Sequence, residues 1–109
     1  MDFNYSCQFT SKAEQDLEEI LHYITYTLCS PLSAKNLSKK IFERINSVRM
    51  FPESGAIVEN EFLTVAVTVR KIIVDNYIVY YTVSKQDNAI IIIRIVYGKR
   101  NLDEIMRNI

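Results

Sequence analysis

The sequence predicts an α+β fold in which a helical hairpin packs on one face of a mainly antiparallel, four-stranded sheet. The predicted order of elements is β-α-α-β-β-β-α. Apolar residues recur at helical spacing through most of the first half of the chain, and they alternate or run together through the second half. The chain has 109 residues, of which 49% are hydrophobic. This is enough for the core of one small domain, which we expect to span residues 1–109.

The chain should begin with a short strand and a helix. Apolar and polar residues alternate over residues 3–9, which is typical of a half-buried strand. Ser11 precedes Glu14 by three residues, and this capping box predicts the first turn of a helix. The apolar stripe of this helix would consist of Ala13, Leu17, Ile20, Leu21, Ile24 and Leu28.

A second helix is predicted to begin at Pro31. Proline is well tolerated at the first helical position, and Ser30 precedes it as a possible cap. The segment 51–55 would end this helix. Because the link between the two helices is short, we expect them to be antiparallel. The apolar stripe of the second helix would consist of Leu37, Ile41, Ile45 and Val48.

Three strands are predicted in the second half, at residues 64–74, 77–84 and 89–97. The turns between them would lie at residues 75–76 and 85–88. The third segment, AIIIIRIVY, is so apolar that it should lie in the interior of the sheet.

A short helix is predicted after Gly98. Asn101 and Glu104 have the spacing of a cap for its first turn. Its apolar residues would be Leu102, Ile105 and Met106.

Composition and charge argue against several classes of function. Lys and Arg together number 13, as do Asp and Glu, so the totals do not suggest a strongly basic nucleic-acid binder. The neutral total hides an acidic first helix and a basic second helix and C-terminus. Two cysteines and one histidine make a poor metal site, and no phosphate-binding loop is present, so we expect neither metal nor cofactor. No apolar run is long enough to span a membrane and no leader is recognisable, which predicts a cytoplasmic protein without membrane contact.

Arg94 interrupts the most apolar segment of the chain. An unpaired guanidinium in that position would cost several kcal/mol. Arg94 must therefore have an acidic partner or point to an open face of the sheet. A structural ion pair with Glu18 or Glu19 is one interpretation, and contact with a target is the other.

Two pairs of adjacent basic residues could form one patch. Lys99 and Arg100 follow Gly98, where exposed cations could bind a phosphate or an acidic partner. Arg70 and Lys71 would lie in the strand before the hairpin. If the strands are neighbours the two pairs could converge, and ordinary solubilising charge is the alternative.

Tyrosines concentrate in the predicted sheet. Tyr77 and Tyr81 should share one face of their strand, and Tyr80 should take the other. At least one of them should be a core residue, and a tyrosine on the other face could stack a base. Tyr97, at the end of the last strand, is open to both interpretations.

Several fragments, spread over nearly the whole chain, carry a family resemblance. They are Asp16–Ile20 with Tyr23-Ile24, Ser30-Pro31, Phe51-Pro52, Arg70-Lys71, Asn76-Tyr77 with Tyr81, and Arg94–Leu102. In this order they resemble the RelE/ParE superfamily, the toxins of bacterial type II toxin–antitoxin modules, including those of plasmid-stabilisation systems. The resemblance implies a growth-inhibiting toxin that is held inactive by a cognate antitoxin protein.

The resemblance implies one of two activities. RelE-like members are mRNA interferases that cleave mRNA on the ribosome, whereas ParE-like members inhibit DNA gyrase and are not enzymes. For the nuclease activity, Lys71 matches a strand lysine of the family's site and Arg100 matches the arginine that follows Gly-Lys. Ile78 and Met106 stand where that branch often has Arg and Tyr.

Those two replacements favour the binding activity. Cleavage through a 2′-hydroxyl needs a base, an acid and stabilisation of the charged phosphorane. Losing one arginine there can cost on the order of 3 kcal/mol. The residues expected to contact a target or a phosphate are Arg70, Arg94, Lys99, Tyr80 and Tyr97.

Three hypotheses follow from the resemblance. The first is a ParE-like inhibitor of DNA gyrase that acts by binding. The second is a ribosome-dependent endoribonuclease with an altered site, in which Lys71 and Arg100 would be catalytic. The third is a non-toxic remnant that still binds its antitoxin.

Overall fold

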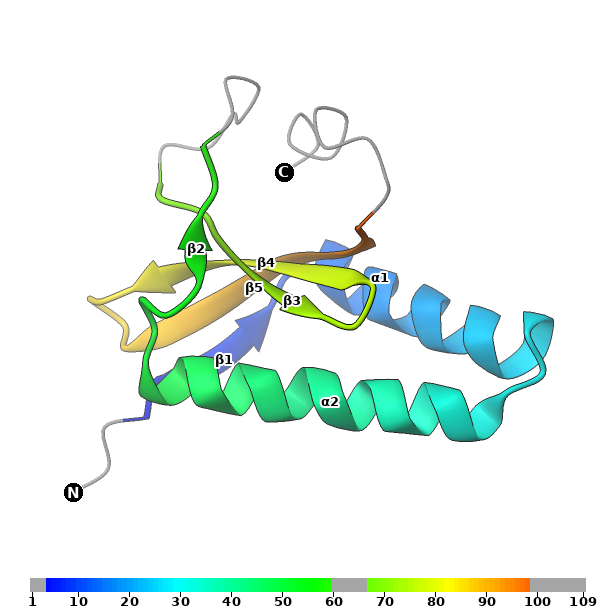
Figure 1. Cartoon of the computed structure of the whole chain (residues 1–109). Helices are drawn as coiled ribbons and strands as arrows, with labels where there is room; N and C mark the ends of the chain where they lie inside the picture. Colours follow the sequence, from blue (N-terminus) through cyan, green and yellow to red (C-terminus); the bar gives the residue numbers. More distant parts are fainter. Residues whose placement is uncertain (1–3, 60–66, 99–109) are drawn as a thin grey trace.

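Two helices pack on one face of a five-stranded mixed sheet (Figure 1). The structure is a computed structural model that describes residues 4–59 and 67–98. Its elements are β1 (Ser6–Phe9), α1 (Ser11–His22), a π-helical turn η1 (Tyr23–Thr27), α2 (Pro31–Met50), β2 (Ala56–Ile57), β3 (Arg70–Val74), β4 (Tyr77–Ser84) and β5 (Ala89–Tyr97). The predicted α+β class is therefore confirmed.

The sheet has the strand order β1-β5-β4-β3-β2. β1 pairs with β5 in parallel, and the other pairs are antiparallel. β5 thus lies in the sheet interior, as its apolar sequence predicts. The predicted count of four strands is wrong, because Ala56 and Ile57 add a fifth by pairing with Lys71 and Arg70.

The strand predicted over residues 64–74 is shorter than expected. Within the described residues it begins at Arg70, because residues 67–69 run outside the β ladder. Residues 64–66 of that prediction lie outside the described part of the chain, as does the whole C-terminal helix predicted around Asn101 and Glu104.

The cap of α1 is one residue earlier than the capping box predicts. The Oγ1 atom of Thr10 accepts a hydrogen bond from the backbone N–H of Ala13 at 3.1 Å, and Ser11 is the first helical residue. Thr10 also donates from its hydroxyl to the carbonyl of Ile93 at 3.1 Å. The side chain that caps the helix therefore also fastens it to β5.

The first helix does not continue regularly to Leu28. It changes to the π-helical turn η1 at Tyr23, and the N–H of Leu28 donates to the Tyr23 carbonyl five residues back, at 3.0 Å. Cys29 then adopts a left-handed conformation with φ 52°. This widened turn removes Leu28 from the apolar stripe, and its side chain is exposed, contrary to the prediction.

The predicted second helix and its stripe are confirmed. Pro31 occupies the first turn of α2, and the predicted apolar residues Leu37, Ile41, Ile45 and Val48 are all buried. They face the helix-covered side of the sheet, where Ile72, Val79, Ile90, Ile92 and Ile95 complete the main core.

The opposite face of the sheet carries a second, smaller apolar cluster. Its buried members are Val69, Tyr80 and Val96, with Val58, Ile78 and Ile93 packed around them. β4 and β5 therefore have apolar side chains on both faces, which explains why β5 lacks simple alternation.

Candidate functional site

Arg94 is committed to a buried ion pair with Asp16 of α1. Its Nε donates to Asp16 Oδ2 at 2.7 Å and one terminal nitrogen donates to Oδ1 at 3.2 Å. Both residues are less than a tenth exposed. The partner is therefore Asp16 rather than the predicted Glu18 or Glu19.

Asp16 also completes the hydrogen bonding of β5. Its Oδ2 accepts the backbone N–H of Ile95 at 3.0 Å. β1 ends at Phe9, opposite Ile92, so within residues 4–59 and 67–98 the edge of β5 beyond that point has no strand partner on this side. The carboxylate thus serves a guanidinium and a strand edge at once, which is how the sheet tolerates a charge in its interior.

Arg70 is occupied by the turn that follows α2. Its guanidinium donates to the carbonyls of Glu53 and Gly55 at 3.0 and 2.8 Å. Tyr81, which is fully buried, donates to the Pro52 carbonyl at 2.8 Å and accepts the N–H of Gly55 at 2.9 Å. Arg70 and Tyr81 together hold this turn against the sheet.

Three of the sequence-predicted residues lie in one row across the sheet. Lys71 of β3 is paired with Tyr80 of β4, and Tyr80 is paired with Arg94 of β5. Tyr80 is only 1% exposed, and its burial raises the pKa of its phenol. Within this row, Lys71 alone is half-exposed.

Tyr97 differs from these residues because it is exposed and lines a cavity. Lys99 and Arg100 lie outside the described residues. Whether they lie close to Arg70 and Lys71, as predicted, therefore stays a prediction. Tyr97 pairs with Tyr77 across β4 and β5, and the two ring centroids are 5.7 Å apart.

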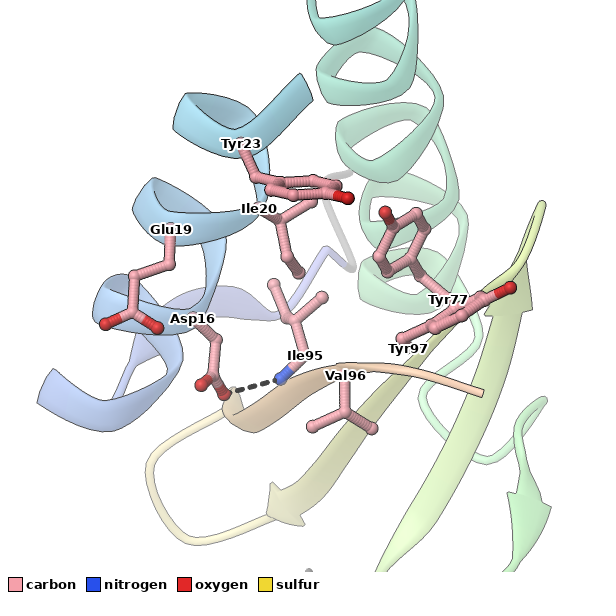
Figure 2. Close-up of a pocket in the computed structure, with 8 residues that line it drawn as sticks. All are labelled: Asp16, Glu19, Ile20, Tyr23, Tyr77, Ile95, Val96 and Tyr97. Atoms are coloured by element: carbon pink, nitrogen blue, oxygen red, sulfur yellow. Dashed lines mark hydrogen bonds between the residues drawn. The ribbon is translucent and has the colours of Figure 1, made fainter. Parts of the chain in front are cut away.

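The cavity beside Tyr97 has a volume of about 340 Å³ and lies between α1, η1 and the ends of β4 and β5. Figure 2 shows its parts. Three tyrosines, Tyr23, Tyr77 and Tyr97, lie on one side, and Asp16 and Glu19 lie on the other. Apolar side chains, chiefly those of Ile20 and Ile95, separate the two groups.

Tyr77 is the tyrosine of this cavity whose pKa responds to its surroundings. Partial burial raises the pKa of Tyr77, and the neighbouring Tyr97 and Tyr23 raise it further. The Tyr77 phenol can donate or accept a hydrogen bond. The aromatic faces, apolar floor and acidic edge of the cavity suit a ligand that is partly apolar and positively charged.

Sequence reasoning missed Tyr23, Tyr77 and Glu19 as members of one site. The sequence left open whether Tyr77 is a core residue. Pairing the two predicted strands in register places Tyr77 opposite Tyr97, and this could have indicated a shared site. Tyr23 enters through η1, and π-helical turns are frequent at functional sites. Its position depends on an irregularity that helical periodicity does not predict.

The described residues limit other chemistries. In residues 4–59 and 67–98, no group of three or more His, Cys, Asp or Glu side chains could hold a metal ion. No helix in that part of the chain has the length and apolar character needed to cross a membrane. Cys7 packs against the core, and its burial raises the pKa of the thiol.

The chain is similar to several solved structures. One is a chain of the chromosomal ParDE toxin–antitoxin system from P. aeruginosa, which is 25% identical with a TM-score of 0.67, over 90% of this chain and 100% of that chain. The archaeal RelE–RelB complex from Pyrococcus horikoshii is 16% identical with a TM-score of 0.57, over 90% and 99%. The isolated E. coli RelE toxin is 16% identical with a TM-score of 0.54, over 96% and 99%. The latter two share the fold.

A family model identifies the family of this chain among the proteins that share the fold. The model for the ParE toxin of the type II toxin–antitoxin system parDE matches residues 7–102. The sequence has no significant match among curated proteins. Since the family model covers most of the chain, from β1 to beyond β5, the chain belongs to the ParE family of type II toxins.

Proposed function

We propose that this toxin acts by binding a protein target, DNA gyrase, and that a cognate antitoxin neutralises it. The observation that carries the proposal is the internal use of three of the five residues expected to contact a target or a phosphate. Arg94 is paired with Asp16, Arg70 is bonded to turn carbonyls, and Tyr80 is buried. These contacts engage all three side chains within the fold, which supports a role in stability over contact with an RNA backbone.

The requirements of RNA cleavage also support binding. A ribonuclease of this kind needs groups that move protons and groups that stabilise a charged phosphorane. At position 78, where the nuclease branch often has arginine, Ile78 packs into the second apolar cluster. Among the described candidates, Lys71 and Tyr97 remain accessible, and they come from opposite sides of β4. Two such groups give little basis for the reaction.

Neutralisation by an antitoxin is supported by two of the similar solved structures. The similar structure from P. aeruginosa belongs to a toxin–antitoxin system, and the one from Pyrococcus horikoshii is a RelE–RelB complex. This chain has exposed apolar side chains on the helical hairpin, among them Tyr23, Tyr26 and Leu32, that a protein partner could cover.

The test is a time course of thymidine and amino-acid incorporation after induction of the toxin in bacteria. Inhibition of gyrase predicts that DNA synthesis fails first, and that Lys71→Ala is as active as the wild type. If translation fails first and Lys71→Ala abolishes the effect, the ribonuclease alternative is correct. If neither falls while soluble protein accumulates, the chain is a non-toxic remnant. Co-expression of the cognate antitoxin should restore both rates.

A further inference from the structure

The tyrosine cavity of Figure 2 has the chemistry of a site for a cationic side chain. Its rings come from three elements, because Tyr23, Tyr77 and Tyr97 line the cavity from η1, β4 and β5. An arginine guanidinium stacks on such rings, while its aliphatic stem packs on apolar groups. Ile20 and Ile95 provide an apolar floor of this kind.

The charge at the cavity edge complements an arginine. Arg94 already compensates Asp16, whereas Glu19 accepts a hydrogen bond from the neutral amide of Gln15 at 3.0 Å. A second cavity of about 350 Å³ adjoins the first through Glu19 and Tyr23, and it adds Glu18. Among the described residues that line these two cavities, none is Lys or Arg, and the one basic side chain is that of His22 in the second cavity. The edge therefore has negative charge available for a cation supplied from elsewhere.

We infer that this cavity, bounded by Tyr23, Tyr77, Tyr97 and Glu19, receives an arginine side chain of the antitoxin. The inference rests on the proposed neutralisation by an antitoxin. It assigns the anchor through which the partner is held at the junction of α1 and the sheet. Arginine suits the site better than lysine, because its planar group stacks on tyrosine rings and is more weakly hydrated.

The chemistry of the cavity can be tested on the whole toxin without a partner. N-acetyl-arginine methylamide is titrated into protein with ¹³C-labelled tyrosine rings, and the neutral N-acetyl-citrulline methylamide serves as the matched probe. We expect saturable shifts confined to Tyr23, Tyr77 and Tyr97 among the seven tyrosines, with affinity at least about fivefold higher for the arginine probe. Equal affinity for both probes, or shifts spread over all tyrosines, would overturn the inference.

Variants locate the binding within the cavity. Tyr97→Leu should weaken the arginine probe about fivefold, and Glu19→Gln about threefold. Tyr26→Leu, on η1 but outside the cavity, and Glu14→Gln, in the first turn of α1, are the matched controls and should leave the affinity unchanged. Because Tyr97 and Glu19 are exposed, these variants should fold normally, which a thermal melt checks. If the probe binds only after Lys99 and Arg100 are both changed to alanine, cations of the chain itself occupy the cavity and the assignment to the antitoxin is wrong.

The same variants separate this inference from the proposed function. With the purified antitoxin, Tyr97→Leu and Glu19→Gln should weaken the complex at least about fivefold and threefold, while both controls bind like the wild type. Unchanged affinity would contradict the arginine anchor and leave neutralisation intact. If the antitoxin does not bind the wild type at all, the proposed neutralisation fails and the assignment of the cavity to an antitoxin arginine fails with it, whatever the arginine probe shows.

Discussion

α1 and β5 both supply residues to two neighbouring sites, and the two sites differ in what they do. At the first, Asp16 and Arg94 close on each other in a buried ion pair. At the second, three residues further along each element, Glu19 and Tyr97 line an open cavity. The same acidic helix and the same strand thus supply one site that holds the fold and one that remains available to a partner. The adjacent sequence does not distinguish the role of Asp16 from that of Glu19. The side chain that each one contacts does distinguish them, because Asp16 pairs with Arg94 and Glu19 bonds only to the neutral amide of Gln15 among the hydrogen bonds described.

The comparison predicts the largest effect at the closed site. Asp16→Ala leaves the Arg94 guanidinium buried without its carboxylate, and should lower the free energy of unfolding by about 3–5 kcal/mol. Urea denaturation measures the loss. The double variant Asp16→Leu with Arg94→Met should recover the part of the loss due to the uncompensated charge, while the N–H of Ile95 still lacks its acceptor. A loss below about 1 kcal/mol for Asp16→Ala would show that the two sites do not differ in this way.

The turn at Gly55, which Tyr81 and Arg70 hold against the sheet, should show the next largest effect of substitution on stability. A Cβ atom on Gly55 would lie 2.5 Å from the Tyr81 hydroxyl and 2.8 Å from the Lys71 carbonyl. Gly55→Ala should therefore lower the free energy of unfolding by about 1–3 kcal/mol through overpacking. Gly98→Ala is the control, since the nearest atom to its Cβ would be the Asn76 carbonyl oxygen at 3.3 Å. Equal melting temperatures for the two variants would contradict the tight closure of this turn.

The burial of Tyr80 makes the stability of the fold sensitive to alkaline pH. Burial raises the pKa of Tyr80 above its ordinary value of 10.0, so the unfolded chain loses this proton at a lower pH than the folded chain. The contribution is complete below pH 10 and is lost as the pH rises through the folded pKa. Tyr80→Phe should accordingly flatten the fall in stability above pH 10. Urea melts at several pH values measure the slope, with Tyr26→Phe as the exposed control; identical slopes would be inconsistent with the burial of Tyr80.

The smallest effect on stability is expected at the open cavity. Glu19→Gln should change the free energy of unfolding by no more than about 0.5 kcal/mol, because the side chain is exposed. The same urea measurement as for Asp16→Ala provides the comparison within one helix. If Glu19→Gln were as destabilising as Asp16→Ala, the cavity edge would be part of the fold rather than a binding surface.

Much of the fold could be predicted from the sequence, because it follows from periodicity. The stripe of α2 and the interior position of β5 are examples. The missed features depend on contacts between distant residues. Thr10 replaces Ser11 as the cap because its hydroxyl also reaches Ile93, and β2 is a strand only through its pairing with β3.

The candidate site was less predictable for the same reason. Arg94 was recognised as needing a partner, but the choice of Asp16 depends on where β1 ends and on the backbone N–H of Ile95, which Asp16 also accepts at that edge. Tyr80 looked available for stacking because no sequence pattern places Val58 and Val69 beside it, and both belong to the second apolar cluster, which buries it. Tyr77 and Tyr97 form a pair only through the β4–β5 register.

The most direct test of the account uses purified toxin in two assays. DNA supercoiling by gyrase is measured with increasing toxin, and cleavage of mRNA is measured in a translating extract with the same preparations. The account predicts inhibition of supercoiling by wild type and Lys71→Ala alike, with mRNA left intact. Cleavage of mRNA by the wild type that is lost in Lys71→Ala, with supercoiling unaffected, would contradict it.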